Sequence, residues 1–175
     1  MLTTKELNNA LEDLLNAFIV EIRKQYALQG HILTGRLANS MRYEITQEDV
    51  RLIGKIFMEE YGLDLNNGVR AKAIPFGNNQ AARDYRAGLM RFWMLRGLSF
   101  AGAKRAAYFT HKKHREEGMP TKASSRFSKN GKRVGALDDA IKAKQEATFD
   151  ALEKRIAKTT KLSILNAFKG VKTKR

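Results

Sequence analysis

The sequence predicts an α+β fold, in which a long N-terminal helix packs on a small antiparallel β-sheet and further helices follow toward the C-terminus. Three observations predict it. Apolar residues recur at helical spacing in the first 25 residues, apolar and polar residues alternate near Tyr43, and helical patterning continues from Ala81 onward. The 175 residues suffice for one domain with its own core, so we expect a single α+β domain over residues 1–175.

The first helix is predicted from Thr4 to about Leu28, with Gly30 as its stop signal. Thr3 and Glu6 fit a capping box, in which each side chain pairs a backbone N–H at the helix start. One apolar stripe follows at helical spacing and consists of Leu7, Leu11, Leu14, Leu15, Phe18 and Ile22. Residues 1–76 are therefore expected to form a core of helix plus sheet.

A small sheet is predicted after this helix. Thr34 is expected to cap a single helical turn that buries Leu37, and residues 41–46 alternate between apolar and polar, as in a half-buried strand. Residues 50–58 are predicted to form the second strand of an antiparallel hairpin. Residues 69–76 are predicted to form a short third strand.

The second half of the chain is predicted to be helical around one loop. Residues 81–118 form a helical hairpin insertion, in which Gly97 ends one helix and Ser99 caps the next. Residues 118–136 have five basic residues and no acidic ones, and we expect this basic loop to be poorly ordered in the isolated protein. A C-terminal helix is predicted over residues 137–168. The hairpin's large aromatic residues are predicted to be core, namely Trp93, Phe100, Tyr108 and Phe109.

What the sequence lacks disfavours several classes of function. Without cysteine there is no disulfide, thiolate metal site or cysteine nucleophile. No apolar run reaches the roughly 18–20 residues of a membrane span, so we expect a cytoplasmic setting, or a particle assembled there, and no membrane partner. His111 and His114 stand three residues apart and Glu117 lies one turn on, but no third histidine or other carboxylate has matching spacing. With no catalytic motif either, we expect no enzyme, no cofactor and no metal.

The charge is strongly asymmetric. The net charge is +15, and residues 1–88 carry 11 basic and 11 acidic residues, so the whole excess lies in residues 89–175. Such asymmetry predicts a surface that meets a polyanion, usually nucleic acid. A basic helix face that keeps the protein soluble, or that docks on an acidic partner protein, explains the charge as well.

One stretch of the chain carries a resemblance to a known family. Residues 34–40, Thr-Gly-Arg-Leu-Ala-Asn-Ser, resemble the TG-x-L-x-x-S signature of the neck and tail-completion proteins, or head–tail connectors, of tailed bacteriophages. In that family the signature follows a long first helix and precedes a strand hairpin, the order predicted here. A glutamate–aromatic–glycine step and a Pro-Phe pair come next. The matching residues are Thr34, Gly35, Leu37, Ser40, Glu60, Tyr61, Gly62, Pro75 and Phe76.

The resemblance covers residues 1–76 and, more loosely, 101–168. Two features depart from the family pattern. Gly77-Asn78-Asn79-Gln80 stands in place of the expected alanine–proline helix start, and residues 81–118 look like an added hairpin.

The resemblance implies a structural virion protein, assembled in the host cytoplasm, that joins head to tail. It would form a cyclic homo-oligomer of sixfold or twelvefold symmetry around the DNA channel, beside neighbouring neck and tail proteins. Basic residues would then meet channel DNA without reading its sequence, or meet an acidic neighbour. The expected contacts are Lys122, Arg126, Lys129, Lys132 and Arg133 in the loop, and Lys154, Arg155, Lys158 and Lys161 on the last helix.

Two alternatives stay open at this point. The main one is a basic DNA-binding protein that uses residues 101–136 and 154–175, either without sequence preference or through a helix–turn–helix. In the latter, a recognition helix would present Lys104, Arg105, Lys112 and Lys113 to a major groove. The weaker alternative is an RNA- or ribosome-associated basic protein.

Overall fold

The computed structural model describes residues 4–49, 51–145, 150–151, 153–154, 157–158 and 161. These residues show the predicted α+β fold, with a long first helix, a two-stranded antiparallel sheet and further helices. They divide into two compact units. The first lies within residues 1–25, 38–58 and 137–175, and the second consists of Tyr26–Leu37 and Glu59–Ala136. Because compactness does not measure folding cooperativity, the single domain stays a prediction.

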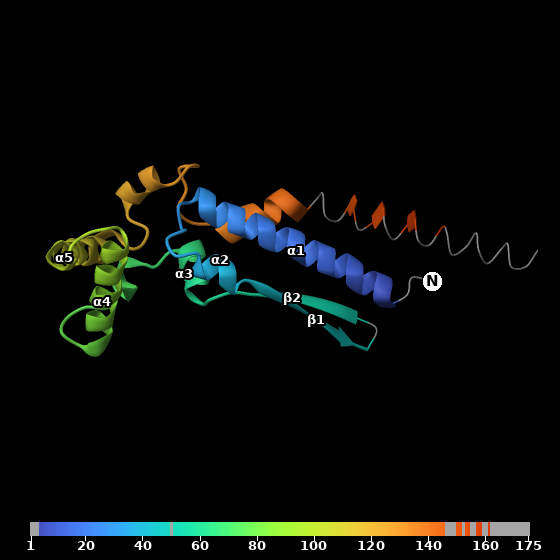
Figure 1. Ribbon diagram of the computed structural model, residues 1–175, viewed down its shortest axis with the longest axis horizontal. Helices are drawn as coiled ribbons and strands as arrows, with labels where there is room; N and C mark the ends of the chain where they lie inside the picture. The colour runs from blue at the N-terminus through green and yellow to red at the C-terminus, as the bar shows by residue number, and fades with distance from the viewer. Residues whose placement is uncertain are drawn as a thin grey trace, which may run out of the picture. The chain divides into compact units, whose positions relative to one another are not determined.

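The first unit is built on helix α1, Thr4–Leu28, and the hairpin of β1, Arg42–Glu48, with β2, Arg51–Phe57. Its register runs from Arg42 opposite Phe57 to Glu48 opposite Arg51. The helix lies along the hairpin (Figure 1), as predicted. The helix and the hairpin lie close together at Gly54, because a Cβ atom there would lie 2.9 Å from the Leu15 side chain.

The core of the first unit includes Leu15 and Ile22 of the predicted apolar stripe of α1, whereas the other predicted stripe residues are half-buried and the predicted stripe does not include Ile19. Leu15, Ile19 and Ile22 are buried, and their spacing of three to four residues places them on one helix face. Glu21 is buried beside them and accepts a hydrogen bond from Gln25 at 2.8 Å. That hydrogen bond lowers the pKa of Glu21, so the buried carboxylate stays ionised.

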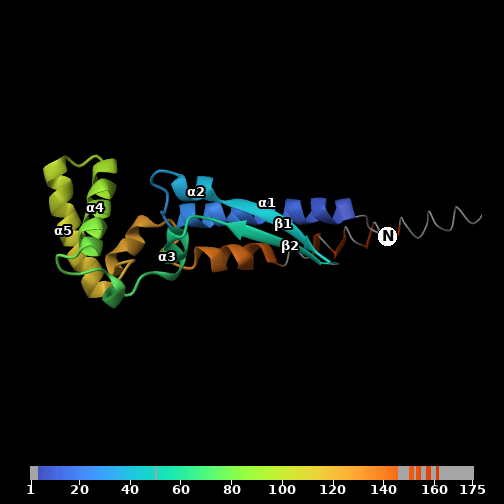
Figure 2. The same cartoon turned by 90° about the horizontal axis from the view of Figure 1, so that it is seen from below.

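The second unit holds most of the remaining helices. They are α2, Arg36–Ser40, whose first two residues lie here, α3, Tyr61–Asn67, α4, Gln80–Leu95, and α5, Phe100–Glu117, with 3₁₀ turns at Ala71–Ala73 and Lys122–Phe127. Helices α4 and α5 lie side by side as the predicted helical hairpin (Figure 2). Ser99 caps α5 as expected, since its hydroxyl accepts a hydrogen bond from the Gly102 N–H.

The third strand predicted at residues 69–76 does not form. Val69 makes only an isolated antiparallel bridge with Met119, and residues 71–73 form a 3₁₀ turn instead. The Asn67-Gly68 pair does not turn a hairpin either. Gly68 has φ +74° and ends α3, and its N–H bonds the Asp64 carbonyl at 2.8 Å. An Asn-Gly pair suits both a hairpin turn and a helix end, because both need a residue with positive φ.

The C-terminal helix is described in part. Residues 136–145 are helical, as are the described residues between 150 and 161. The other positions of the predicted 137–168 helix, including Arg155, lie outside the described residues, as does the capping residue Thr3.

Candidate functional site

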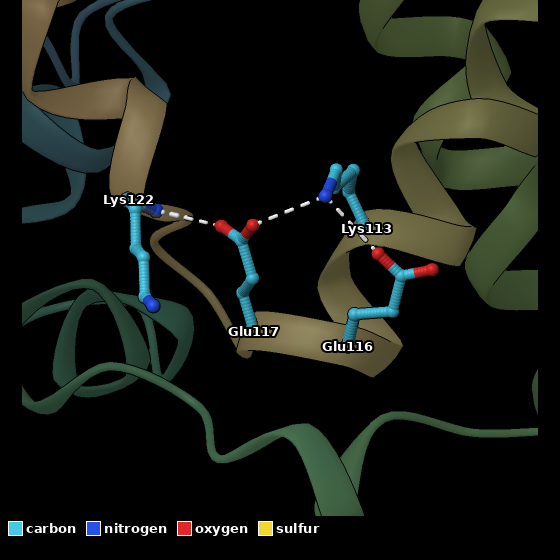
Figure 3. Close-up of polar contacts among 4 residues, drawn as sticks. All are labelled: Lys113, Glu116, Glu117 and Lys122. Carbon is cyan, nitrogen blue, oxygen red and sulfur yellow. Dashed lines mark hydrogen bonds and ion pairs between the residues drawn. The ribbon is translucent and has the colours of Figure 1, made fainter.

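Within the second unit, the first end of the basic loop 118–136 is held by backbone hydrogen bonds between Met119 and Val69. The Val69 N–H donates to the Met119 carbonyl at 2.6 Å, and the Met119 N–H donates back at 2.8 Å. Glu117, the last residue of α5, accepts hydrogen bonds from the Lys122 N–H at 2.9 Å and from the Lys113 ammonium at 3.2 Å (Figure 3). The Lys122 hydrogen bond is the main cause that lowers the Glu117 pKa. The carboxylate therefore joins the end of α5 to the start of the loop.

The far end of the loop is held on the end of α1. The Arg133 guanidinium donates to the Gln29 carbonyl at 2.6 Å, and the fully buried Gln29 amide donates to the Val134 carbonyl at 3.0 Å. The Lys129 N–H donates to the Leu28 carbonyl at 2.7 Å. The loop predicted to be poorly ordered is thus anchored at both ends, which its composition alone does not reveal.

His31 completes this anchor. Its Nε2 lies 3.1 Å from the Arg133 carbonyl oxygen, and its ring packs edge-on against Tyr26. Burial, together with the positive charge of Arg133, lowers the pKa of His31 to about 4. The imidazole is therefore neutral near pH 7, and its Nε2–H donates to the carbonyl.

Four of the five predicted loop contacts are exposed. Lys122, Arg126, Lys129 and Lys132 present their side chains to solvent. Arg133 does not, because it is half-buried against Gln29 and burial lowers its pKa. The structure therefore makes Arg133 an anchor of the loop, in place of the contact residue that the sequence predicts.

The predicted contacts on the last helix are described except for Arg155. Lys154, Lys158 and Lys161 are helical and exposed, and their spacing of four and three residues places them on one side. They belong to the first unit, whereas the loop belongs to the second.

The family-like motifs meet one another in the second unit. Leu37 is 5% exposed, and its backbone hydrogen-bonds the Tyr61 hydroxyl. Arg36 forms an ion pair with Glu59 at 3.0 Å, and buried Tyr26 donates to the Gly62 carbonyl at 2.8 Å. The 34–37 turn and the start of α3 therefore form one hydrogen-bonded group.

The other motif residues have local roles. Thr34 accepts the Arg36 N–H at 3.3 Å, Gly35 has φ +71°, and Ser40 ends α2. Glu60 is the N-cap of α3 but makes no side-chain capping bond.

The Pro75-Phe76 pair lies against α5. The Pro75 carbonyl accepts from His111 Nε2 at 2.7 Å, and Arg115 stacks on the exposed Phe76 ring at 3.3 Å. His114 bonds the Tyr85 hydroxyl at 2.7 Å through Nδ1. Within the described residues, no group of three His, Cys, Asp or Glu side chains is placed to hold a metal ion. His111 and His114 thus hold α5 by hydrogen bonds to Pro75 and to Tyr85 of α4.

Three aromatic residues predicted to be core are exposed. Phe100 is 63% exposed, Tyr108 62% and Phe109 54%. The buried side of α5 is made instead of Ala103, Ala107 and His111, which recur every four residues. The two alanines are the signal in the sequence that indicates the buried face, because residues four apart lie on the same side of a helix.

The comparisons with known proteins give no relative. No family model, curated protein or solved structure matches the chain. In the part of the chain that is described, no helix is both long and apolar enough to cross a membrane.

Proposed function

We propose that this protein is a structural virion protein of a tailed-phage neck, which joins head to tail in a cyclic ring around the DNA channel. The observation that supports it best is the hydrogen bond between the motif residues Leu37 and Tyr61, and the ion pair between their neighbours Arg36 and Glu59 adds to it. The two motifs flank the β-hairpin, whose register places Arg42 opposite Phe57, so the hairpin brings them close together. Here these contacts join the 34–37 turn to the start of α3, which supports an interpretation of the two motifs as parts of one structural unit.

The surface of the α4–α5 hairpin also supports an assembling protein. Met94, Leu95 and Leu98 are exposed around the Gly97 turn, where a Cβ atom would meet nothing within 4 Å. Grouped apolar side chains of this kind usually mark contacts with other proteins. The proposed partners are further copies of this chain, in sixfold or twelvefold rings, and neighbouring neck and tail proteins. The role needs no catalytic group and no cofactor.

Negative-stain microscopy and native mass measurement of the purified full chain test this proposal. We expect closed rings with six or twelve copies. A chain that stays monomeric or dimeric at every concentration, and that binds short duplex DNA in that state, would contradict it.

A second candidate is a DNA-binding protein without sequence preference. The observation that favours it is the exposure of Lys122, Arg126 and Lys129 on a loop that is held at both ends. Fixed cations bind phosphate at a lower entropic cost than cations on a mobile loop. Tight duplex binding by a monomer that forms no ring would favour this candidate.

A further inference from the structure

The outer face of α5 presents aromatic side chains where a soluble helix usually presents polar ones. The buried face is taken by Ala103, Ala107 and His111, so the large rings of Tyr108 and Phe109 lie on the solvent side. Their ring centroids are 5.6 Å apart in an edge-to-face arrangement. Exposed aromatic rings have a free-energy cost in water that a bound ligand would remove.

These rings lie between cations at helical spacing. One row consists of Lys104, Tyr108 and Lys112, and the next consists of Arg105, Phe109 and Lys113; all six residues are exposed. Residues four apart on a helix are neighbours along one side, about 6 Å apart along the axis. Each row therefore reads cation, aromatic ring, cation.

The first row is open for a ligand, whereas the second is partly engaged. Among the described residues, Lys104 and Lys112 have no ion-pair partner. Lys113 is bound to Glu116 at 3.1 Å and to Glu117 at 3.2 Å (Figure 3), and Arg105 lies 6.0 Å from the Phe109 ring centroid. The row through Tyr108 is thus the better binding surface.

The charge around this face favours a polyanion. No acidic residue occurs between Asp84 and Glu116, and the basic residues of that stretch are Arg86, Arg91, Arg96, Lys104, Arg105, Lys112, Lys113 and Arg115. A ligand that covers the face therefore gains from negative charge.

The aromatic rings distinguish unpaired from duplex nucleic acid. In a duplex the base faces are already stacked on each other, whereas an unpaired base has a face free to stack on a side chain. A helix in the major groove reads base edges through polar side chains. The centre of this face holds Tyr108 and Phe109 instead, so it suits unpaired bases better than a duplex groove. We propose that the outer face of α5 binds single-stranded nucleic acid, with bases on Tyr108 and Phe109 and phosphates at Lys104, Arg105 and Lys112.

Fluorescence anisotropy of the full chain with labelled oligothymidylate, and with a duplex of the same length, tests this proposal. Stacking is worth about 1–3 kcal/mol per base, so Tyr108→Ala should weaken oligothymidylate binding from about fivefold to more than a hundredfold. Tyr108→Phe keeps a ring and should bind like the parent. The matched control is Phe127→Ala, which removes another exposed aromatic residue of the same unit beside a cation.

The outcomes separate this proposal from the ring. Selective loss of single-strand binding in Tyr108→Ala and Phe109→Ala, with duplex binding and circular dichroism unchanged, supports it. Oligothymidylate binding that survives both substitutions overturns it, as does equal loss in Phe127→Ala. A folded chain that binds no oligothymidylate also overturns it. That result would instead favour an acidic protein as the partner of this face. Ring formation, measured by microscopy, is independent of each result.

Discussion

The Arg133 guanidinium donates a hydrogen bond of 2.6 Å to the backbone carbonyl of Gln29, across 104 positions of the chain. Gln29 holds the same segment from the other side, because its buried amide donates to the Val134 carbonyl. The residue after α1 and the end of the basic loop are therefore clamped reciprocally. This clamp fixes the backbone on which the exposed loop cations stand.

Gly30 is the tightest point of the clamp, so Gly30→Ala should destabilise the protein strongly. A Cβ atom there would lie 2.8 Å from an Arg133 guanidinium nitrogen and closer still to the Phe127 carbonyl oxygen. The control is Gly131→Ala, because Gly131 has nearly the same φ, +73° against +72°, but meets nothing within 4 Å. Both variants lose about 1–2 kcal/mol from the left-handed backbone, and Gly30→Ala should lose more. Urea unfolding measures the difference, and equal costs would show that the clamp is not formed.

Removal of Arg133 should loosen the loop. Arg133→Ala breaks a charge-assisted hydrogen bond, which typically contributes about 1.5–3 kcal/mol, and leaves the Gln29 carbonyl without this donor. We expect a protease of broad specificity to cut residues 118–136 faster in this variant than in the parent. Lys132→Ala, which removes an exposed cation next to it, should be cut at the parental rate. Rapid cutting of the parent loop itself would instead favour the disorder predicted from composition.

Acidification should weaken the clamp through His31. The unfolded residue takes up a proton near pH 6.5 and the folded one only near pH 4. Its contribution to stability is therefore complete above pH 6.5 and is lost as the pH falls toward 4. Unfolding free energies measured across this interval should fall less steeply in His31→Gln than in the parent. His114, whose pKa burial also lowers, adds a contribution of the same sign, so His114→Gln should flatten the profile separately.

The sequence predicts the local elements of this protein better than their long-range contacts. Helix α1, the β-hairpin and the Ser99 cap follow from short-range periodicity and capping chemistry, and all three are confirmed. The bridge between Val69 and Met119 joins segments 50 positions apart, and no periodicity encodes it. It stands where the sequence predicts a third strand.

The candidate site shows the same division. The exposure of Lys122 and Lys129 follows from composition, but the burial of Arg133 depends on Gln29 and His31, which lie a hundred positions away. The apolar character of Tyr108 predicts burial, and that prediction is wrong, because the alanines at 103 and 107 form the inner face.

The short turn at residues 34–40 should depend on Leu37. Leu37→Ala removes a side chain that is 5% exposed, and such core truncations cost about 2–5 kcal/mol. Leu33→Ala is the matched control, because the Leu33 side chain is 39% exposed and its loss should cost clearly less than the loss of Leu37. Denaturant unfolding compares the two. Similar costs would show that the turn resembling the phage family is not packed as described.

Any duplex binding by the loop cations should be blind to sequence and fall steeply with salt, because the release of condensed counterions drives it. The double variant Lys122→Gln, Arg126→Gln removes two exposed cations without touching the clamp. It should reduce the slope of log affinity against log salt by about 0.9 for each phosphate that the variant no longer neutralises. The control is Arg70→Gln, Lys72→Gln, which removes two exposed cations elsewhere in the same unit. Titrations of several unrelated duplexes at two salt concentrations measure both effects. A preference for one duplex that survives high salt would instead favour a helix–turn–helix regulator, since base contacts depend on salt far less than phosphate contacts.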